Sequence, residues 1–223
     1  MNGPRMLDFL KSRRSVRAFE PRPIAREILS RLVEAATSAP SATNRQPWRF
    51  TVVTSASLLE QVARAVRARV EEVKAAVANE PHAFELEHYW NYLHQPLSAA
   101  AALVVPQTRS LPDLIERLVE SSGREPSSLG VCDRHVEVCA TSAATMALIL
   151  QAHAEGLGAC WMTGPLLASE ELGRLLRIAS PWKPLAVVAL GWPSTGGPSA
   201  RVRKPLSQVV DWLDDAPTPG SNQ

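Results

Sequence analysis

Hydrophobic side chains recur at helical spacing in two long segments of this chain. Residues 25–38 and residues 58–78 each place apolar side chains three or four positions apart, which predicts a helix with one apolar face. Pro40 stops the first helix, because proline cannot continue one. The apolar faces are Ile28, Leu32, Val33 and Ala36 in the first helix, and Leu58, Val62, Val66, Val70, Val73 and Val77 in the second.

Four further segments are predicted to be helical, at residues 6–12, 111–121, 133–155 and 169–178. We expect the helix at 133–155 to be the longest and to end before two nearby glycines. Its small side chains permit close helix packing, which indicates a central helix or one at a subunit interface. The stripe expected to face a neighbour is Val136, Cys139, Ala143, Ala147 and Leu150.

Strand-like segments lie between these helices. Residues 49–54 (RFTVVT) are β-branched, and the apolar runs at 99–106 and 185–190 predict buried strands. Residues 160–163 predict a short strand or a turn. Helices and strands mix without the regular alternation of a doubly wound sheet, so the pattern predicts an α+β fold.

The composition is that of an ordinary globular protein. Hydrophobic residues make up 45% and charged residues 21% of the chain. No internal repeat or linker divides it, so residues 1–223 are predicted to form one domain, with a Pro/Gly/Ser-rich arm from about residue 194. No apolar run approaches the roughly 20 residues that span a bilayer, and no signal peptide is apparent. We therefore expect a cytoplasmic protein with no membrane partner.

Positive charge is concentrated at the start of the chain. The formal net charge is only +2, yet residues 1–50 carry ten Lys and Arg against four Asp and Glu. Such a stretch suits nucleic acid or an anionic cofactor. The arginines are interleaved with apolar residues that belong to folded structure, which favours an anionic cofactor and no nucleic-acid partner.

The cysteines and histidines predict no disulfide framework and no metal site. The three cysteines form no CxxC pair, and their odd number argues against a disulfide framework. The spacing of His82, His88 and His94 suits no single helical face. No HxxxH or HExxH motif occurs, so no metal site is predicted.

Two motifs carry the expected binding chemistry. The turn RRSVRAF at residues 13–19 offers guanidinium groups and a hydroxyl, which suit a phosphate. The loop APSATNRQPWRF at residues 39–50 cannot continue a helix, and its backbone and amide groups suit the edge of a planar polar ring. A phosphate at one end and a hydrogen-bonding heterocycle at the other describe a nucleotide or a flavin.

Two later motifs, GLGACWMTGP at residues 156–165 and RVRKPL at residues 201–206, follow in the same chain. In this order and spacing the four motifs resemble the FMN-dependent nitroreductases over nearly the whole sequence. The resemblance implies a nitroreductase-like fold, with a central mixed or antiparallel sheet flanked by helices. It also implies an intertwined homodimer with FMN at the subunit interface.

The resemblance assigns the basic residues to the flavin. Arg13 and Ser15 match contacts to the phosphate and the ribityl chain, and Arg17 matches a cation beside the pyrimidine edge. The C-terminal arm is expected to converge on the same phosphate. The cofactor-binding residues predicted in these two segments are Arg13, Arg14, Ser15, Arg17, Arg201 and Arg203.

The other expected contacts come from two loops. Pro40, Ser41, Ala42 and Asn44 match positions that the second subunit contributes, with Gln46 supporting the loop. Where this chain has Ala42, some relatives have Ser or Gly, so contacts there come from the backbone. The turn with Met162, Thr163 and Gly164 matches a stretch whose N–H groups face flavin N5 and O4. Trp48 and Phe50 are expected in the core.

The roles of two segments are left open between alternatives. Relatives often carry an Asn and a Lys after the QPW strand; here Arg67, Arg69 and Lys74 are candidate replacements or a solvated face. The aromatic stretch with Tyr89 and Trp90 suits a lid over the flavin equally with a packed helix pair or a dimer contact.

The resemblance implies an enzyme that carries hydride from NAD(P)H through FMN to an electron-poor acceptor, such as a nitroaromatic or a quinone. It also implies ping-pong kinetics, with no dedicated protein acid or base. One alternative keeps FMN but changes the reaction to dehydrogenation, dehalogenation or flavin fragmentation; the sequence NRQPW argues against fragmentation. The other alternative is a non-enzymatic binder of nucleic acid or flavin, which lacks the expected sequence marks.

Overall fold

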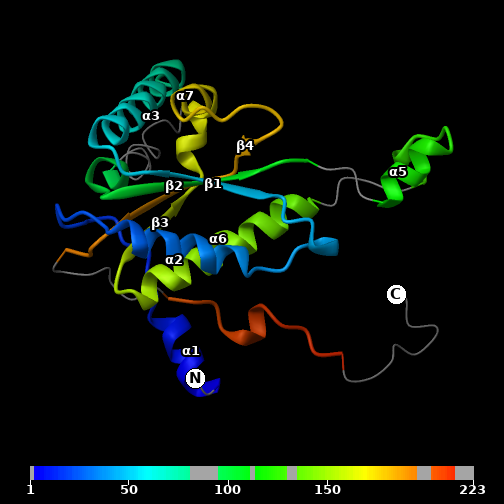
Figure 1. The fold of residues 1–223 in the computed structure, drawn as a ribbon, viewed down its shortest axis with the longest axis horizontal. Helices are drawn as coiled ribbons and strands as arrows, with labels where there is room; N and C mark the ends of the chain where they lie inside the picture. Colours follow the sequence, from blue (N-terminus) through cyan, green and yellow to red (C-terminus); the bar gives the residue numbers. More distant parts are fainter. Residues whose placement is uncertain (1–2, 81–94, 111–113, 130–134, 195–201, 214–223) are drawn as a thin grey trace.

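An antiparallel sheet forms the centre of the molecule (Figure 1). The computed structural model describes residues 3–80, 95–110, 114–129, 135–194 and 202–213. The strand order is β1-β2-β5-β3, the short β4 also pairs with β2, and every one of these pairings is antiparallel. The strands are β1 Trp48–Val53, β2 Ala102–Thr108, β3 Gly158–Met162, β4 Lys183–Pro184 and β5 Val187–Gly191.

Helices cover both faces of this sheet (Figure 1). Helices α3 (Ala56–Ala76) and α7 (Ser169–Leu175) lie on one face, and α2 (Arg26–Thr37) and α6 (Val136–Ala154) lie on the other. The remaining helical segments are α1 Gly3–Ser12, α5 Leu114–Ser121 and the short 3-10 turns η1 Ala42–Asn44, η3 Pro126–Leu129, η4 Gly164–Ala168 and η5 Leu206–Gln208.

The two central strands are buried on both sides. In β2, Leu103 and Val105 join the core under α3, whereas Ala102 and Val104 join the core under α2 and α6. β5 divides its residues in the same way. Strands covered on both faces are continuous apolar runs, which is why the runs at 99–106 and 185–190 were recognisable in the sequence.

The α+β prediction is confirmed, and each expected helix and strand in the described chain forms within a few residues of its predicted bounds. The prediction that the helix at 133–155 is the longest was wrong: α3 has 21 residues, whereas α6 has 19. The aromatic segment 84–92 and Cys132 lie outside the described residues.

The predicted stripe on α6 is not the side that packs on the sheet; in the single chain its residues are exposed or half-buried. The buried positions are led by Ala140, Ala144 and Leu148, while Cys139 and Ala143 are exposed. The sequence could not show which side of α6 packs on the sheet, because α6 has apolar or small residues around most of its circumference. The exposed side of α6 therefore keeps a surface of small and apolar residues in the single chain.

After α1, the chain runs along the free edge of β3. Val16 donates its N–H to the carbonyl of Ala159 at 3.0 Å, and Glu20 donates to the carbonyl of Trp192 at 2.8 Å. Gly158 and Gly191 permit this approach: a Cβ on Gly158 would lie 2.7 Å from Val16, and one on Gly191 would lie 2.7 Å from Phe19. The backbone of residues 15–20 is thereby fixed against the sheet.

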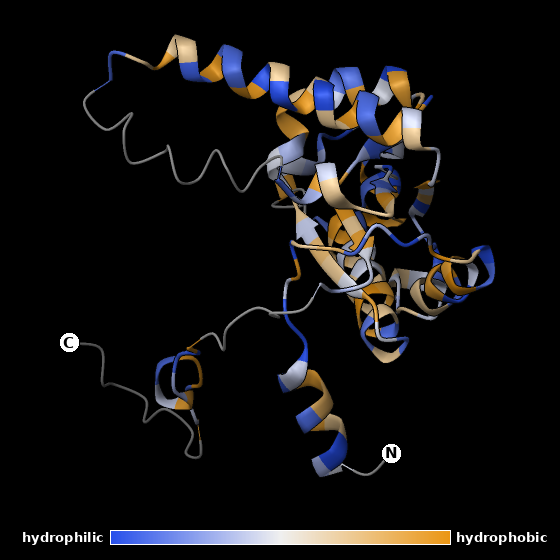
Figure 2. Ribbon diagram, turned by 90° about the vertical axis from the view of Figure 1, so that its left-hand side faces the viewer, coloured by the Kyte–Doolittle hydropathy of each residue, from blue (hydrophilic) through white to orange (hydrophobic). Residues whose placement is uncertain are grey.

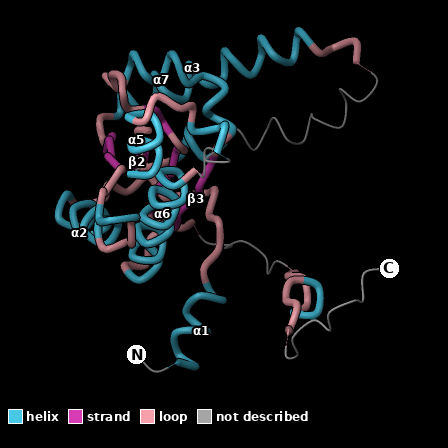
Figure 3. Tube along the Cα trace, turned by 90° about the vertical axis from the view of Figure 1, so that its right-hand side faces the viewer, coloured by secondary structure: helices cyan, strands magenta, loops and turns pink. Residues whose placement is uncertain are grey.

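Two segments project from this body. Figure 1 shows α5 away from the sheet, and Figure 2 and Figure 3 show residues 202–213 apart from it as well. Both carry exposed apolar side chains, including Leu118 in α5 and Trp212 near the end of the described chain. Among the described helices, none combines the length and apolar character needed to cross a membrane.

Replacing Gly191 with Ala is expected to destabilise the fold by about 1–3 kcal/mol, because the new methyl group overlaps the Phe19 ring in a packed site. Urea denaturation of the purified variant measures this change. Gly3→Ala is the matched control, since no atom lies within 4 Å of its added Cβ. Equal midpoints for Gly191→Ala and the unmodified protein would contradict the close approach.

An ion pair ties α2 to the end of α6 and gives a pH-dependent prediction. Arg31 donates from Nε and Nη2 to the Glu155 carboxylate at 2.7 and 2.8 Å, and this contact lowers the pKa of Glu155 from 4.5 to about 2. A lowered folded-state pKa stabilises the fold above pH 4.5, and this contribution disappears between pH 4.5 and 2. We expect Glu155→Gln to lose stability at pH 7 but to match the unmodified protein near pH 2, as measured by urea midpoints across that range.

Candidate cofactor site

The arginine turn lies in a defined order along β3. Ser15 forms a parallel bridge with Ala159, so the chain from Arg13 to Arg17 runs in the same direction as β3. Arg13 therefore lies toward the start of the strand, and Arg17 lies toward Met162 at its end.

The turn is braced by its own backbone. Arg14 donates from Nη1 to the carbonyl of Arg13 at 3.0 Å, and Arg17 donates from Nη1 to the carbonyl of Ser15 at 3.4 Å. Burial raises the pKa of the Cys160 thiol, and the positive charge of Arg17 acts in the opposite direction.

His153 lies beside the arginine turn, and no sequence motif predicted it there. Its Nε2 lies 2.8 Å from the Ser12 hydroxyl, and its ring lies 4.9 Å from that of Phe9. Burial lowers the pKa of His153, and the charges of Arg13 and Arg14 lower it further. The Ser12–His153 contact places the start of the arginine turn near the C-terminal end of α6.

The turn after β3 offers backbone donors at the opposite end of the strand. Met162 is buried, Thr163 is exposed, and Gly164 is the first residue of η4. A first helical residue has no N–H acceptor within its own helix, so the N–H of Gly164 is available to a ligand. The four steps from Ala159 to Thr163 span about 13 Å of extended chain.

The Pro40–Gln46 loop adopts an unusual backbone. Thr43, Asn44 and Gln46 have φ angles of 51°, 55° and 48°, a left-handed region that non-glycine residues seldom occupy. Gln46 donates its backbone N–H to the Ser41 hydroxyl at 3.0 Å and its side-chain amide to Asn44 Oδ1 at 3.2 Å. The prediction that Gln46 supports this loop is confirmed.

The loop and the arginine turn lie at opposite ends of α6. Arg45 pairs with Glu137 in the first turn of α6 at 3.6 Å, whereas the arginine turn borders His153. The 16 residue steps from Glu137 to His153 span about 24 Å of helix. One chain therefore does not bring Ser41 and Asn44 next to the arginines.

The described side chains show where the two core aromatics and two of the α3 cations lie. Trp48 is buried and Phe50 is half-buried in the core beside α2 and α6, as predicted. On α3, Arg69 pairs with Glu72 at 2.6 Å and Lys74 with Glu71 at 3.5 Å. These α3 cations form a solvated face with neighbouring carboxylates.

Arg203, the C-terminal candidate within the described residues, stands apart from the turn. Arg203 lies on the exposed segment 202–213, away from the sheet in Figure 2. Arg201 lies outside the described residues, as do Tyr89, Trp90 and Tyr92. The single chain therefore does not bring Arg203 to Arg13.

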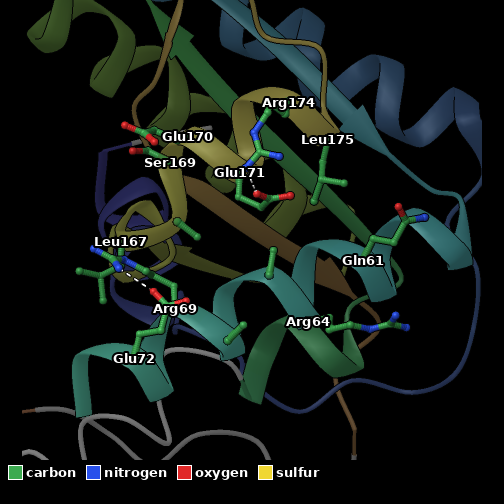
Figure 4. A pocket seen from close by; sticks show the side chains of 13 residues that line it. Gln61, Arg64, Arg69, Glu72, Leu167, Ser169, Glu170, Glu171, Arg174 and Leu175 are labelled. Carbon is green, nitrogen blue, oxygen red and sulfur yellow. Dashed lines mark hydrogen bonds and ion pairs between the residues drawn. The ribbon is translucent and has the colours of Figure 1, made fainter. Parts of the chain in front are cut away.

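A groove of about 700 Å³ lies between α3 and α7 (Figure 4). Its rim is polar, and its charges are paired on the surface: Arg69 with Glu72, and Arg174 with Glu171. None of the predicted cofactor-binding residues lines it. The groove is thus separate from the candidate site.

Taken together, one edge of β3 presents guanidinium groups at its start, a further cation along its length and, at its end, a backbone N–H with no acceptor inside its own helix. Cations and a hydroxyl suit a phosphate, and N–H donors suit a ring nitrogen or oxygen that gains negative charge. The separation of about 13 Å suits an elongated ligand with a phosphate at one end and a ring at the other.

Comparison with known proteins identifies the family. A model of the nitroreductase family matches residues 10–192. An NADH dehydrogenase of Thermus thermophilus is 29% identical over 204 residues, which cover 90% of this chain and 92% of that protein.

Two solved structures share the fold. A BluB-like flavoprotein from Clostridium difficile 630 superposes with a TM-score of 0.82 at 22% identity, covering 93% of this chain and 98% of that one. A nitroreductase with bound FMN from Desulfitobacterium hafniense DCB-2 gives 0.69 at 20% identity, covering 96% and 100%. Because the family model spans the arginine turn, the Pro40–Gln46 loop and all five strands, the chain belongs to the nitroreductase family.

Proposed function

We propose that this protein is an FMN-dependent oxidoreductase that transfers hydride from NAD(P)H to an electron-poor acceptor, such as a nitroaromatic or a quinone, by ping-pong kinetics. As a member of the nitroreductase family, the chain is an NAD(P)H-dependent oxidoreductase. FMN, when bound, supplies the ability to accept hydride from one substrate and return it to another. The protein's part is to bind, orient and tune that group.

The observation that carries the proposal is the order of groups along the edge of β3. Arg13 and Ser15 are suited to the phosphate and the ribityl chain, since they lie at the start of the strand. Arg17 and the N–H groups of Thr163 and Gly164 lie toward its end. This order matches the linear layout of FMN, with the phosphate at one end and the ring at the other.

The residues near the ring would favour its reduced form. A guanidinium beside the pyrimidine edge and backbone donors near N5 and O4 stabilise negative charge that develops there. Arg17 is already fixed, because its backbone runs beside β3. No side chain in this arrangement has to act as an acid or a base.

A second subunit would complete the site. Two antiparallel copies of α6 would bring the Glu137 end of one chain, with its Pro40–Gln46 loop, beside the His153 end of the other. The exposed small residues Cys139 and Ala143, with Met146, support close packing along this side of α6. In the homodimer, Pro40, Ser41, Ala42 and Asn44 would then contact the partner's flavin.

The C-terminal segment fits the same assembly. Val202, Leu206, Trp212 and Leu213 are 97%, 73%, 77% and 91% exposed in the single chain. So many large apolar side chains on one short segment are typical of a surface that packs on a partner. Such an arm would bury these residues on the second subunit and carry Arg203 to the phosphate.

The purified protein is expected to be yellow and to bleach rapidly with NADH or NADPH under anaerobic conditions, because bound FMN would take up hydride. Its visible absorption spectrum before and after mixing is the measurement. A yellow protein that resists both pyridine nucleotides would indicate another flavin reaction. A protein that stays colourless after incubation with FMN would overturn the proposal.

Arg13→Ala should weaken FMN binding by roughly 10- to 100-fold, the range for loss of one charge-assisted hydrogen bond. Titration of the FMN-free protein with FMN, followed by flavin fluorescence, gives the dissociation constants. Arg26→Ala is the matched control, an exposed arginine at the start of α2 on a different element. Equal affinity in Arg13→Ala and the unmodified protein would remove Arg13 from the site.

A further inference from the structure

A second recess lies directly beyond the turn that carries Gly164. It has a volume of about 870 Å³ and is lined by residues from η4, α7 and the chain leading into β4. Leu166 of η4 lies on its wall, two residues after Gly164. The five residues of η4 rise by about 10 Å, so the recess lies within roughly that distance of the proposed flavin ring.

The recess is rich in positive charge. Its lining includes Arg174, Arg177 and Lys183 against a single carboxylate, Glu170. Arg174 is engaged by Glu171, but neither Arg177 nor Lys183 forms an ion pair with any part of the chain that the structure describes. These two cations are therefore available to an anion.

An aromatic wall stands beside these cations. Trp182 lines the recess, and the Arg109 guanidinium lies 4.9 Å from the centre of the Trp182 ring. Arg109 Nε is buried and has no hydrogen-bond acceptor within the described residues. Contact with Arg109 holds the indole in place and adds positive charge behind it.

Arg177 occupies a position that normally selects glycine. Helix α7 ends in a Schellman motif, in which Ile178 donates to the carbonyl of Gly173 at 2.8 Å and Arg177 has a φ of 54°. Helix α6 ends with the same hydrogen-bond pattern, and there the equivalent residue is Gly156, with a φ of 77°. The chain thus accepts a disfavoured backbone at Arg177, where the side chain lies on the recess.

We infer that this recess binds the phosphate groups of the reducing dinucleotide, with Arg177 and Lys183 as specificity-determining contacts. The inference rests on the proposed function, since it assumes that the nicotinamide stacks on a flavin beside Gly164. A small nitroaromatic or quinone on the ring is too short to reach across η4. A dinucleotide is long enough to do so, and its phosphates match two cations that form no ion pair within the described residues.

The test compares Arg177→Gly with the unmodified protein in anaerobic rapid mixing with NADH and with NADPH. We expect the concentration of dinucleotide needed for half-maximal flavin reduction to rise about three- to tenfold, with the limiting rate unchanged, because an exposed phosphate contact is lost. The substitution should leave the melting temperature equal or higher, since glycine suits the left-handed position. Misfolding therefore cannot explain weaker binding.

Two controls separate this inference from the proposed function. Arg177→Lys keeps the charge and should stay close to the unmodified protein. Reduction by 1-benzyl-1,4-dihydronicotinamide, which has no phosphate, should be the same in all three proteins.

The outcomes are distinct. Flavin reduction by both dinucleotides at unchanged concentrations in Arg177→Gly would overturn the inference and leave the proposed function intact. A loss with NADPH alone would assign the contact to the 2′-phosphate, and an equal loss with NADH would assign it to the pyrophosphate; either supports the inference. Failure of every dihydronicotinamide to reduce the unmodified protein would instead contradict the proposed function.

Discussion

The close approach of residues 15–20 to the sheet is the constraint on which the candidate site depends. Gly158 and Gly191 have no Cβ, and the space is filled by Val16 and Phe19. The backbone hydrogen bonds from Val16 and Glu20 then fix the direction of this segment along β3 and past β5. Without that anchoring, the arginine turn would be a flexible cationic stretch, and its guanidinium groups would lose the order that matches an elongated anion.

Helix α6 sets the second constraint, because it separates the two halves of the predicted site. Its first turn holds the Pro40–Gln46 loop through the Arg45–Glu137 pair, and its last turn borders the arginines through His153. Antiparallel pairing of two copies is the simplest symmetric arrangement that joins the halves. The apolar character that hid the helix phase in the sequence also supports this assembly: one side packs on the sheet, and the other remains exposed with Met146 and Ala143.

Much of the fold could be predicted from the sequence, because periodic apolar patterns mark buried faces. The valines of α3 and the runs in β2 and β5 lie where they were expected. The phase of α6 could not be predicted, since small residues on all sides give no preferred face. Residue order along β3 was equally hidden, because the bridge between Ser15 and Ala159 joins positions 144 residues apart. Motif resemblance named the candidate residues and assigned the Pro40–Asn44 positions to a second subunit, and the structure shows that one chain holds this loop and the arginine turn at opposite ends of α6.

Left-handed backbone in the described chain is concentrated where ligands are proposed to bind. Five non-glycine residues have positive φ: three lie in the Pro40–Gln46 loop, one is Arg177, and one, His135, precedes α6 next to Glu137, which anchors that loop. Where the same geometry serves only to end a helix, at Gly156, the chain uses glycine.

A side chain at a position that favours glycine lowers the stability of the fold, so its presence implies a compensating interaction. Asn44 and Gln46 gain a mutual hydrogen bond that shapes the loop. Arg177 gains no ion pair within the described chain, and that makes binding of an anion from solution the most direct physical reason for an arginine there.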